Sequence, residues 1–355
     1  MAETADAPHV VMRADGSSTL GRGHLVRCRN LARALEQRGF AVTFVRSGAE
    51  DDFLADEDVR WIPGGSSPED DARATLHAVG PFGPAVVVVD HYGLDAAWER
   101  TVAASGSAVV VIDDLADRDH ACDVLIDQNP LPAERYGGRV PEGARRLVGM
   151  RFALLPAGGS VPDDDAGSRE RRSEVTRLLV GFGGGGDLAP IALALDALDD
   201  PRFDAVTVDL VIGVEDRVEE VRSLIGIGRG DVHVHGWVAD LAPLMAGADL
   251  ALGAGGISVL ERLRAGLPAV VVSVADNQEA TCRVLHDQGL LVHAGRLGEV
   301  GPQTVAEALE RLMRDDGARR RIEQQGPRAV DGRGAVRCAD AIVEIAGSVR
   351  HRSGM

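Results

Sequence analysis

The stretch from His9 to His24 reads HVVMRADGSSTLGRGH and joins an apolar run to a glycine-bent turn. After it, apolar residues recur at helical spacing over 25–37. The pattern predicts a strand over 9–13, a turn, and a helix over 24–38. His24 then stands where the strand ends and the helix starts, and the positive helix end disfavours a charged ring there. We therefore expect a neutral imidazole that can take up a proton, and His24 is the strongest catalytic candidate.

Strand and helix patterns continue to alternate through the first half of the chain. The run Val86 to Val89 is apolar throughout, as expected for a parallel strand that is covered on both faces. Such alternation is typical of a doubly wound α/β domain. We predict further strands near 41–46, 85–90, 108–112 and 123–126, and further helices near 69–80 and 94–104.

A polar stretch over 157–173, rich in Gly, Asp and Arg, reads as a linker and divides the chain. A second strand–helix series follows it, so we predict the α/β fold class with two Rossmann-like doubly wound domains that face a cleft. The predicted parts are an N-terminal domain over 1–156, the linker, a C-terminal domain over 174–333, and a last segment, 334–355, whose helix packs back on the first domain. The second series has predicted strands near 177–181, 206–212, 231–234, 248–252, 269–273 and 290–293, and predicted helices near 187–198, 216–225, 240–246, 257–265, 277–288, 302–314 and 316–326.

Composition narrows the class of protein. The 355 residues carry a net charge of −17, which argues against nucleic acid or an anionic membrane as a general partner. The sequence has neither a signal peptide pattern nor an apolar run of the ~20 residues that a membrane span needs. The four cysteines are far apart and form no metal-ligand spacing, so we expect reduced thiols in a cytoplasmic protein without metal or cofactor, acting as a monomer or weak dimer.

Two glycine-rich turns follow predicted strands in the second domain. In the first, over 181–187, Gly183, Gly184 and Gly185 would let backbone N–H groups approach a phosphate. The alternative is a merely tight turn, although four consecutive glycines exceed what a turn requires. No Lys-Ser or Lys-Thr follows, so the turn is not a P-loop.

The second glycine turn, over 253–261, begins another predicted helix. Its candidate nucleotide-binding residues are Gly255, Gly256, Ile257 and Ser258, with the Glu261 carboxylate placed to accept hydrogen bonds from ribose hydroxyls. Glu261 alone is equally explained as a first-turn acid favoured by the helix dipole. Together the two turns predict a nucleotide-diphosphate site.

Polar residues at other predicted strand ends complete the candidate site. A third turn holds Asn277 and Gln278, amides suited to a sugar, after Asp276, a good N-cap. Gly23 and Asp90 are further candidates for sugar binding. Asp15 and Tyr92 are expected to act beside His24, Asp15 by orienting the turn or the imidazole, although packing explains Tyr92 nearly as well. His91 is a weaker alternative base. The neighbouring pair Asp113 and Asp114 reads as loop caps rather than metal ligands.

Taken together, these stretches resemble the UDP-sugar hydrolase family of pseudaminic acid biosynthesis. The resemblance rests on segments 13–24, 89–95, 112–116, 122–123, 127–130, 181–187, 253–266 and 275–278, in the family's order. It implies a GT-B architecture, shared with the glycosyltransferase that makes lipid II. It also implies nucleotide binding by the C-terminal domain and a catalytic role for His24, with Tyr92 and Asn277 near the sugar.

The main hypothesis is therefore hydrolysis of a UDP-linked acetamido deoxy sugar, with His24 as the general base that activates water. The alternative is a GT-B glycosyltransferase in which the same site activates an acceptor hydroxyl or amine. A third hypothesis is a non-catalytic protein that binds nucleotide sugars.

Overall fold

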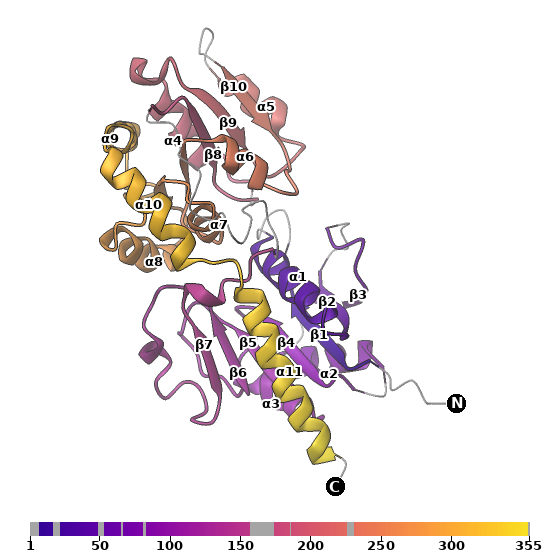
Figure 1. Cartoon of the computed structure of the whole chain (residues 1–355). Coiled ribbons are helices and arrows are strands. Elements are labelled where there is room, and N and C mark those ends of the chain that lie inside the picture. The colour runs from indigo at the N-terminus through magenta and orange to yellow at the C-terminus, as the bar shows by residue number, and fades with distance from the viewer. Residues whose placement is uncertain are drawn as a thin grey trace. The chain divides into compact units, whose positions relative to one another are not determined.

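The computed structural model describes residues 7–16, 22–48, 53–64, 67–80, 83–156, 174–184, 186–225 and 231–353 (Figure 1). The chain divides into two compact units. The first consists of residues 1–17, 24–157 and 333–355, and the second of residues 18–23 and 158–332, each as far as described.

The first unit is built on a seven-stranded parallel sheet of order β3-β2-β1-β4-β5-β6-β7. The order runs outward in both directions from β1 and β4, as in a doubly wound fold. The elements are β1 (His9–Ala14), α1 (Gly23–Glu36), β2 (Ala41–Ser47), β3 (Val59–Ile62), α2 (Pro68–Ala78), β4 (Val86–Asp90), α3 (Ala96–Ala103), β5 (Ala108–Ile112), β6 (Val124–Asp127), η1 (Ala133–Tyr136), β7 (Arg145–Val148), η2 (Met150–Phe152) and α11 (Gly334–Ser353).

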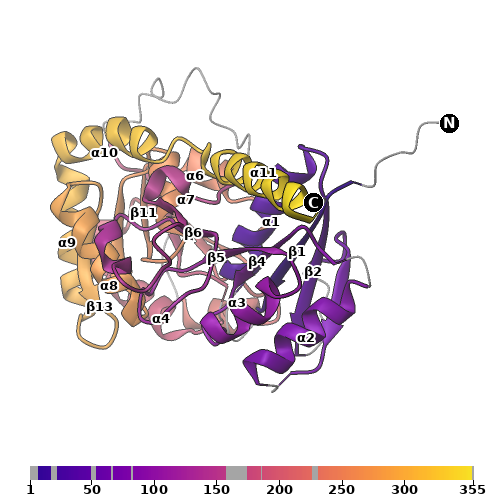
Figure 2. The same ribbon diagram turned by 90° about the horizontal axis from the view of Figure 1, so that it is seen from below.

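Helices cover both faces of this sheet. On one face α1 and α11 share an apolar core with strand residues such as Met12 and Val88. On the other face Trp98 of α3 and Ala72 of α2 pack on Val87 and its neighbours. Figures 1 and 2 show α11, the C-terminal helix, running beside α1 on the first unit.

The second unit has a six-stranded parallel sheet of order β10-β9-β8-β11-β12-β13. Here the order runs outward from β8 and β11. The elements are β8 (Arg177–Gly181), α4 (Ala189–Leu198), η3 (Pro201–Phe203), β9 (Thr207–Val211), α5 (Val218–Leu224), β10 (Val232–His235), α6 (Ala242–Gly247), β11 (Leu250–Ala254), α7 (Ser258–Arg264), β12 (Ala269–Ser273), α8 (Asp276–Asp287), β13 (Val292–Arg296), α9 (Pro302–Arg314) and α10 (Asp316–Ala329).

The predicted strands and helices are present, and the fold class is confirmed. Two strands, β3 and β7, were missed. Both lie at sheet edges and are short, with arginines that break the apolar pattern. Charged side chains protect an edge strand from pairing with other chains, and they also hide it from a hydrophobicity pattern. Among the described helices, none combines the length and apolar character that a membrane crossing requires.

Candidate active site

The candidate site of the first unit lies where β1 and β4 end side by side. Ala14, the last residue of β1, pairs in register with Asp90, the last residue of β4. The chain leaves these two strands toward opposite sides of the sheet, which opens a crevice at their carboxyl ends in open α/β folds. His24 is the second residue of α1, the helix that follows β1.

His24 and Asp90 form a hydrogen-bonded pair at this point. The Nδ1 atom of His24 lies 2.5 Å from Oδ1 of Asp90, whose side chain is fully buried, whereas 20% of the His24 side chain is exposed. Burial alone would raise the pKa of Asp90, but the charge of Arg27 and then the contact with His24 outweigh it and hold that pKa well below its usual range. Because the carboxylate only accepts, Nδ1 carries the proton and Nε2 is the nitrogen left for a reacting proton.

Arg27, one turn further along α1, binds the same carboxylate. Its Nε donates to Oδ2 of Asp90 at 2.5 Å and its Nη2 to Oδ1 at 2.6 Å, in the two-pronged geometry that guanidinium and carboxylate favour. Asp90 was predicted to bind sugar, and this is wrong because the carboxylate is buried and already holds Arg27 and His24. Its side chain contacts His24 instead.

Tyr92 and Asp114 close the group around His24. The Tyr92 ring meets the His24 ring edge-on, with centroids 4.7 Å apart, and Tyr92 is 43% exposed. The Tyr92 hydroxyl donates to Oδ2 of Asp114 at 3.2 Å, and Arg27 Nη1 donates to the same oxygen at 3.0 Å. Tyr92 therefore lies beside His24 as predicted from the strand ends, and Asp114 joins the site unexpectedly.

Asp15 belongs to a different network. Its carboxylate accepts from Arg13 at 2.7 Å and from both the backbone N–H and the hydroxyl of Ser47 at 2.7 Å, and it lies 3.4 Å from Nε2 of His91. The expectation that Asp15 orients the imidazole of His24 is wrong, because Asp90 occupies that position. Asp15 instead ties the end of β1 to the end of β2 and to His91.

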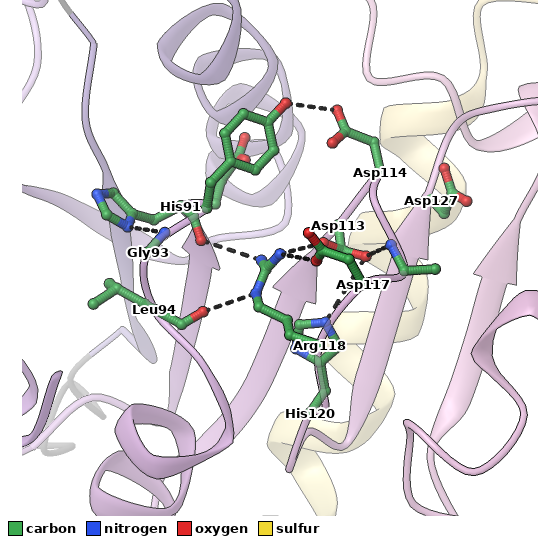
Figure 3. A network of polar contacts seen from close by, with 12 residues as sticks. His91, Gly93, Leu94, Asp113, Asp114, Asp117, Arg118, His120 and Asp127 are labelled. Carbon is green, nitrogen blue, oxygen red and sulfur yellow. Dashed lines mark hydrogen bonds and ion pairs between the residues drawn. The ribbon is translucent and has the colours of Figure 1, made fainter. Parts of the chain in front are cut away.

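The predicted pair of loop caps splits into two roles. Asp113 accepts from the Ala116 N–H at 2.8 Å, as a cap does, and also pairs with Arg118 at 2.9 Å (Figure 3). Asp114 contacts Tyr92 and Arg27, so a cap is the wrong description for it. Within the described residues no three His, Cys, Asp or Glu side chains are grouped so as to hold a metal ion.

In the second unit the first glycine turn leaves β8 at the corresponding switch point. Gly181 pairs in register with Gly253 of β11, and Gly183 has a φ of +95°, in the region that favours glycine. Gly184 lies against the Trp237 ring, since a β-carbon there would be 3.7 Å from it, and Trp237 is 38% exposed. Gly185 lies outside the described residues.

The second glycine turn is packed more tightly than its sequence suggests. Gly253 belongs to β11 rather than to the turn, and Gly255 is buried, with its N–H donating to Oε1 of Gln278 at 3.1 Å. A β-carbon on Gly255 would collide with the Cys282 sulfur. The prediction that Gly255 offers its N–H to a nucleotide is therefore wrong, because Gln278 already accepts that N–H.

Gly256, Ile257 and Ser258 are partly exposed where α7 begins. Glu261 lies in the first turn of α7. Burial raises the pKa of Glu261 to about 7, so its carboxyl group changes charge near neutral pH.

The third turn differs from its prediction at two residues. Asp276 is not the N-cap of α8: Ala275 is, and the Asp276 side chain pairs with Arg296. The Gln278 oxygen accepts from the N–H groups of Gly255 and Val274, so its role is to join two turns rather than to bind sugar through that oxygen. Asn277 is exposed, as is Gly23 at the start of α1, where a β-carbon would meet nothing within 4 Å.

Sequence reasoning missed Arg27, Asp114 and Trp237. Arg27 follows His24 by three residues and so shares its helix face, which was an available signal. Asp114 was noticed but assigned to the loop. Nothing in the local sequence marks Trp237, since its place beside Gly184 depends on the sheet order.

Comparisons with known proteins fit this geometry. Residues 191–315 match the family model described as glycosyl transferases group 1. The chain is similar to the spore coat polysaccharide biosynthesis protein SpsG of Bacillus subtilis strain 168, with 28% identity over 348 residues, 95% of this chain and 98% of that protein. It is also 28% identical over 199 residues, 54% of each chain, to the UDP-N-acetylglucosamine--N-acetylmuramyl-(pentapeptide) pyrophosphoryl-undecaprenol N-acetylglucosamine transferase of Acidithiobacillus ferrooxidans.

Solved structures show the same fold at lower identity. CalG4, the calicheamicin glycosyltransferase, matches with a TM-score of 0.64 and 19% identity, over 97% of this chain and 99% of that chain. Arabidopsis thaliana UGT89C1, complexed with UDP-L-rhamnose, matches with a TM-score of 0.64 and 16% identity, over 96% of this chain and 99% of that chain. The chain is therefore a protein of the GT-B fold class whose second unit is similar to the glycosyl transferases group 1.

Proposed function

We propose that the chain is a glycosyltransferase that uses a nucleoside-diphosphate sugar as donor and His24 as general base. Nε2 of His24 takes the proton of an acceptor hydroxyl while the hydroxyl oxygen forms a bond to the anomeric carbon of the sugar. The bond from that carbon to the diphosphate oxygen breaks, and its electron pair leaves with the nucleoside diphosphate. The observation that carries the proposal is the His24–Asp90 pair at the switch point of the first sheet.

In this proposal the second unit binds the nucleotide. The backbone N–H groups of Gly183, Gly184 and the stretch 256–258 hold the diphosphate, as glycine-rich turns do for anions. Trp237 lies beside Gly184 with the Arg22 guanidinium over its ring, 5.2 Å from the centroid, and we assign the exposed part of the ring to the base. Glu261 accepts hydrogen bonds from the ribose. The family match over 191–315 and the UDP-sugar complex of a protein with the same fold support this assignment.

In the first unit we assign the acceptor to the exposed groups around His24. In the second unit we assign contacts with the donor sugar to the third turn. Tyr92 contacts the acceptor or the sugar through its exposed ring, and Asn277 and Gly23 supply further polar contacts. The comparisons support a transferase, the alternative in our sequence analysis, more than the hydrolase that we predicted first.

Water remains the second candidate acceptor, because segments such as 13–24 and 89–95 resemble the UDP-sugar hydrolases. In that case the same base would activate water, and the sugar, an acetamido deoxy sugar in that family, would be released free.

The test incubates the purified protein with a panel of UDP-sugars, with and without a panel of acceptors that carry a sugar hydroxyl. We expect UDP release that depends on an acceptor, and a His24→Ala variant slower by about 10²–10⁴-fold that still binds UDP in calorimetry. His77→Ala, at an exposed position on α2, serves as the matched control. UDP release without acceptor would identify a hydrolase, and tight donor binding without turnover would contradict both enzymatic proposals.

A glycine variant tests the nucleotide assignment. Gly213 has a φ of +78°, and a β-carbon there would lie 2.5 Å from the Gly183 carbonyl oxygen and 2.7 Å from the Gly184 Cα. Gly213→Ala should therefore displace the first glycine turn and weaken UDP binding about tenfold or more, equivalent to about 1.4 kcal/mol. Gly298→Ala is the control: its φ is +86°, but its β-carbon would meet nothing within 4 Å. Equal UDP affinity of both variants in calorimetry would remove the first glycine turn from the nucleotide site.

A further inference from the structure

We propose that Arg27 is a positioning residue that fixes the His24–Asp90 pair and whose charge opposes protonation of the imidazole. The inference rests on the proposed role of His24 as base and adds a third residue to it. Arg27 is assigned no contact with substrate.

The geometry makes Arg27 the anchor of Asp90. The guanidinium donates to both oxygens of the Asp90 carboxylate, at 2.5 Å to Oδ2 and 2.6 Å to Oδ1. Oδ1 also accepts a hydrogen bond from His24. Arg27 is 5% exposed and Asp90 1% exposed, so the fork is shielded from water. A planar, five-donor group fixes a carboxylate in orientation as well as position, which a single ammonium does not.

Charge gives Arg27 its second effect. Nη2 of Arg27 lies 3.4 Å from Nδ1 of His24, so the guanidinium charge opposes a positive charge on the ring. Asp90 and Asp114 act in the opposite direction. One cation and two carboxylates leave one net negative charge beside the His24 ring, and removal of Arg27 would leave two.

Within the part of the chain that the structure describes, the other titratable groups near His24 carry no positive charge that could substitute for that of Arg27. Tyr92, from the loop after β4, meets the ring edge-on and remains a neutral phenol that donates to Asp114. Cys28 of α1 lies with its sulfur 3.6 Å from Oδ2 of Asp90, and burial raises the pKa of that thiol well above its usual value, so it also stays neutral. Arg27 is thus the cation among the described groups at this pair.

Three variants separate charge from geometry. Arg27→Met removes both, Arg27→Lys keeps the charge but loses the fork, and Asp114→Asn removes an opposing charge. We measure the pH at which half of the His24 rings are protonated, by NMR of ¹⁵N-labelled histidine in the full chain, with the His24 signal identified by its loss in His24→Ala. The pH dependence of kcat/KM is measured in parallel.

We expect the half-protonation pH of His24 to rise by about one unit or more in Arg27→Met, to stay near wild type in Arg27→Lys, and to fall in Asp114→Asn. The acidic limb of kcat/KM should move with it, and Arg27→Lys should show a lower kcat with an unchanged limb, because only orientation is lost. An unmoved midpoint in Arg27→Met overturns the inference. Should Arg27→Met fail to fold, the direction of the midpoint in Asp114→Asn decides instead.

The two proposals fail in different ways. The NMR midpoint requires no turnover, so a midpoint that shifts in a chain without transferase activity supports the Arg27 inference and contradicts the proposed function. If the wild type has transferase activity but the half-protonation pH of His24 is unchanged in Arg27→Met, the proposed function is supported and the Arg27 inference is contradicted.

Discussion

Asp90→Asn is expected to lower kcat/KM by about 10⁴-fold, the loss found when the carboxylate of a His–carboxylate pair becomes an amide. The variant keeps the shape of the side chain, but its NH₂ group competes for the position that faces His24. An NH₂ group there requires Nδ1 to accept, which places the ring proton on Nε2 and removes the base. UDP binding, assigned to the second unit, should be unchanged.

The same substitution also weakens a buried ion pair. Arg27 would lose its charged partner, and breaking such a pair costs about 3–5 kcal/mol. Loss of activity must therefore be separated from loss of folded protein.

Asp71→Asn provides the matched control. Asp71 is a buried carboxylate that is gripped by Arg13 through Nε at 3.0 Å and Nη2 at 2.7 Å, the same fork that Arg27 forms with Asp90. It contacts Trp98 and Thr75 rather than His24. We expect Asp71→Asn to lose similar stability while kcat/KM per folded molecule stays within a few-fold of wild type. A similar kcat/KM for the two variants would remove Asp90 from the chemistry.

Much of this fold is predictable from sequence because its strands are buried on both faces. Val86 to Val89 of β4, for example, are apolar without alternation, and only a central parallel strand needs that pattern. The edge strands β3 and β7 escape because one side of each meets water, where arginines are tolerated. A hydrophobicity pattern in the sequence reflects how deeply a segment is buried, and the edge strands of a sheet are buried least.

The sequence predicts where the site residues lie, but not which other residues they contact. His24 follows from a strand, a turn and a helix that are contiguous in sequence. Asp90 was misassigned because its burial depends on Arg27, from a helix 63 residues away in the chain. Gly255 was misassigned for the same kind of reason, since its N–H is taken by Gln278 from another helix. Which carboxylates and amides remain available to a ligand is decided by tertiary contacts.

The stability of the first unit is expected to fall as pH rises from about 6.5 to about 9, because of His120. The ring of His120 lies in a buried acidic surrounding, with Nδ1 2.7 Å from Oε1 of Glu99 and Nε2 3.8 Å from Oδ2 of Asp113 (Figure 3). Burial opposes a charge on the ring, but the contacts with Asp113 and Glu99 outweigh it and raise the pKa of His120 to about 9.

The sign follows from proton binding in the two states. Between pH 6.5 and 9 the folded chain keeps the His120 proton, whereas the unfolded chain, with an ordinary histidine pKa near 6.5, has released it. The stabilisation is therefore complete below pH 6.5 and lost as pH rises through 9. A pKa difference of this size corresponds to about 3 kcal/mol.

His120→Asn isolates the effect, because its amide still donates to Glu99 but does not titrate. Denaturant unfolding, followed by Trp61 and Trp98 in a Trp237→Phe background, reports on the first unit. Between pH 6 and pH 9.5 the free energy of unfolding of the wild type should fall by about 3 kcal/mol more than that of His120→Asn. The buried cysteines are present in both proteins, so the comparison cancels their contribution. His77→Asn, at an exposed histidine of the same unit, should follow the wild type. Parallel pH profiles for the wild type and His120→Asn would mean that His120 is neutral in the folded chain and that its single ring N–H donates to Glu99.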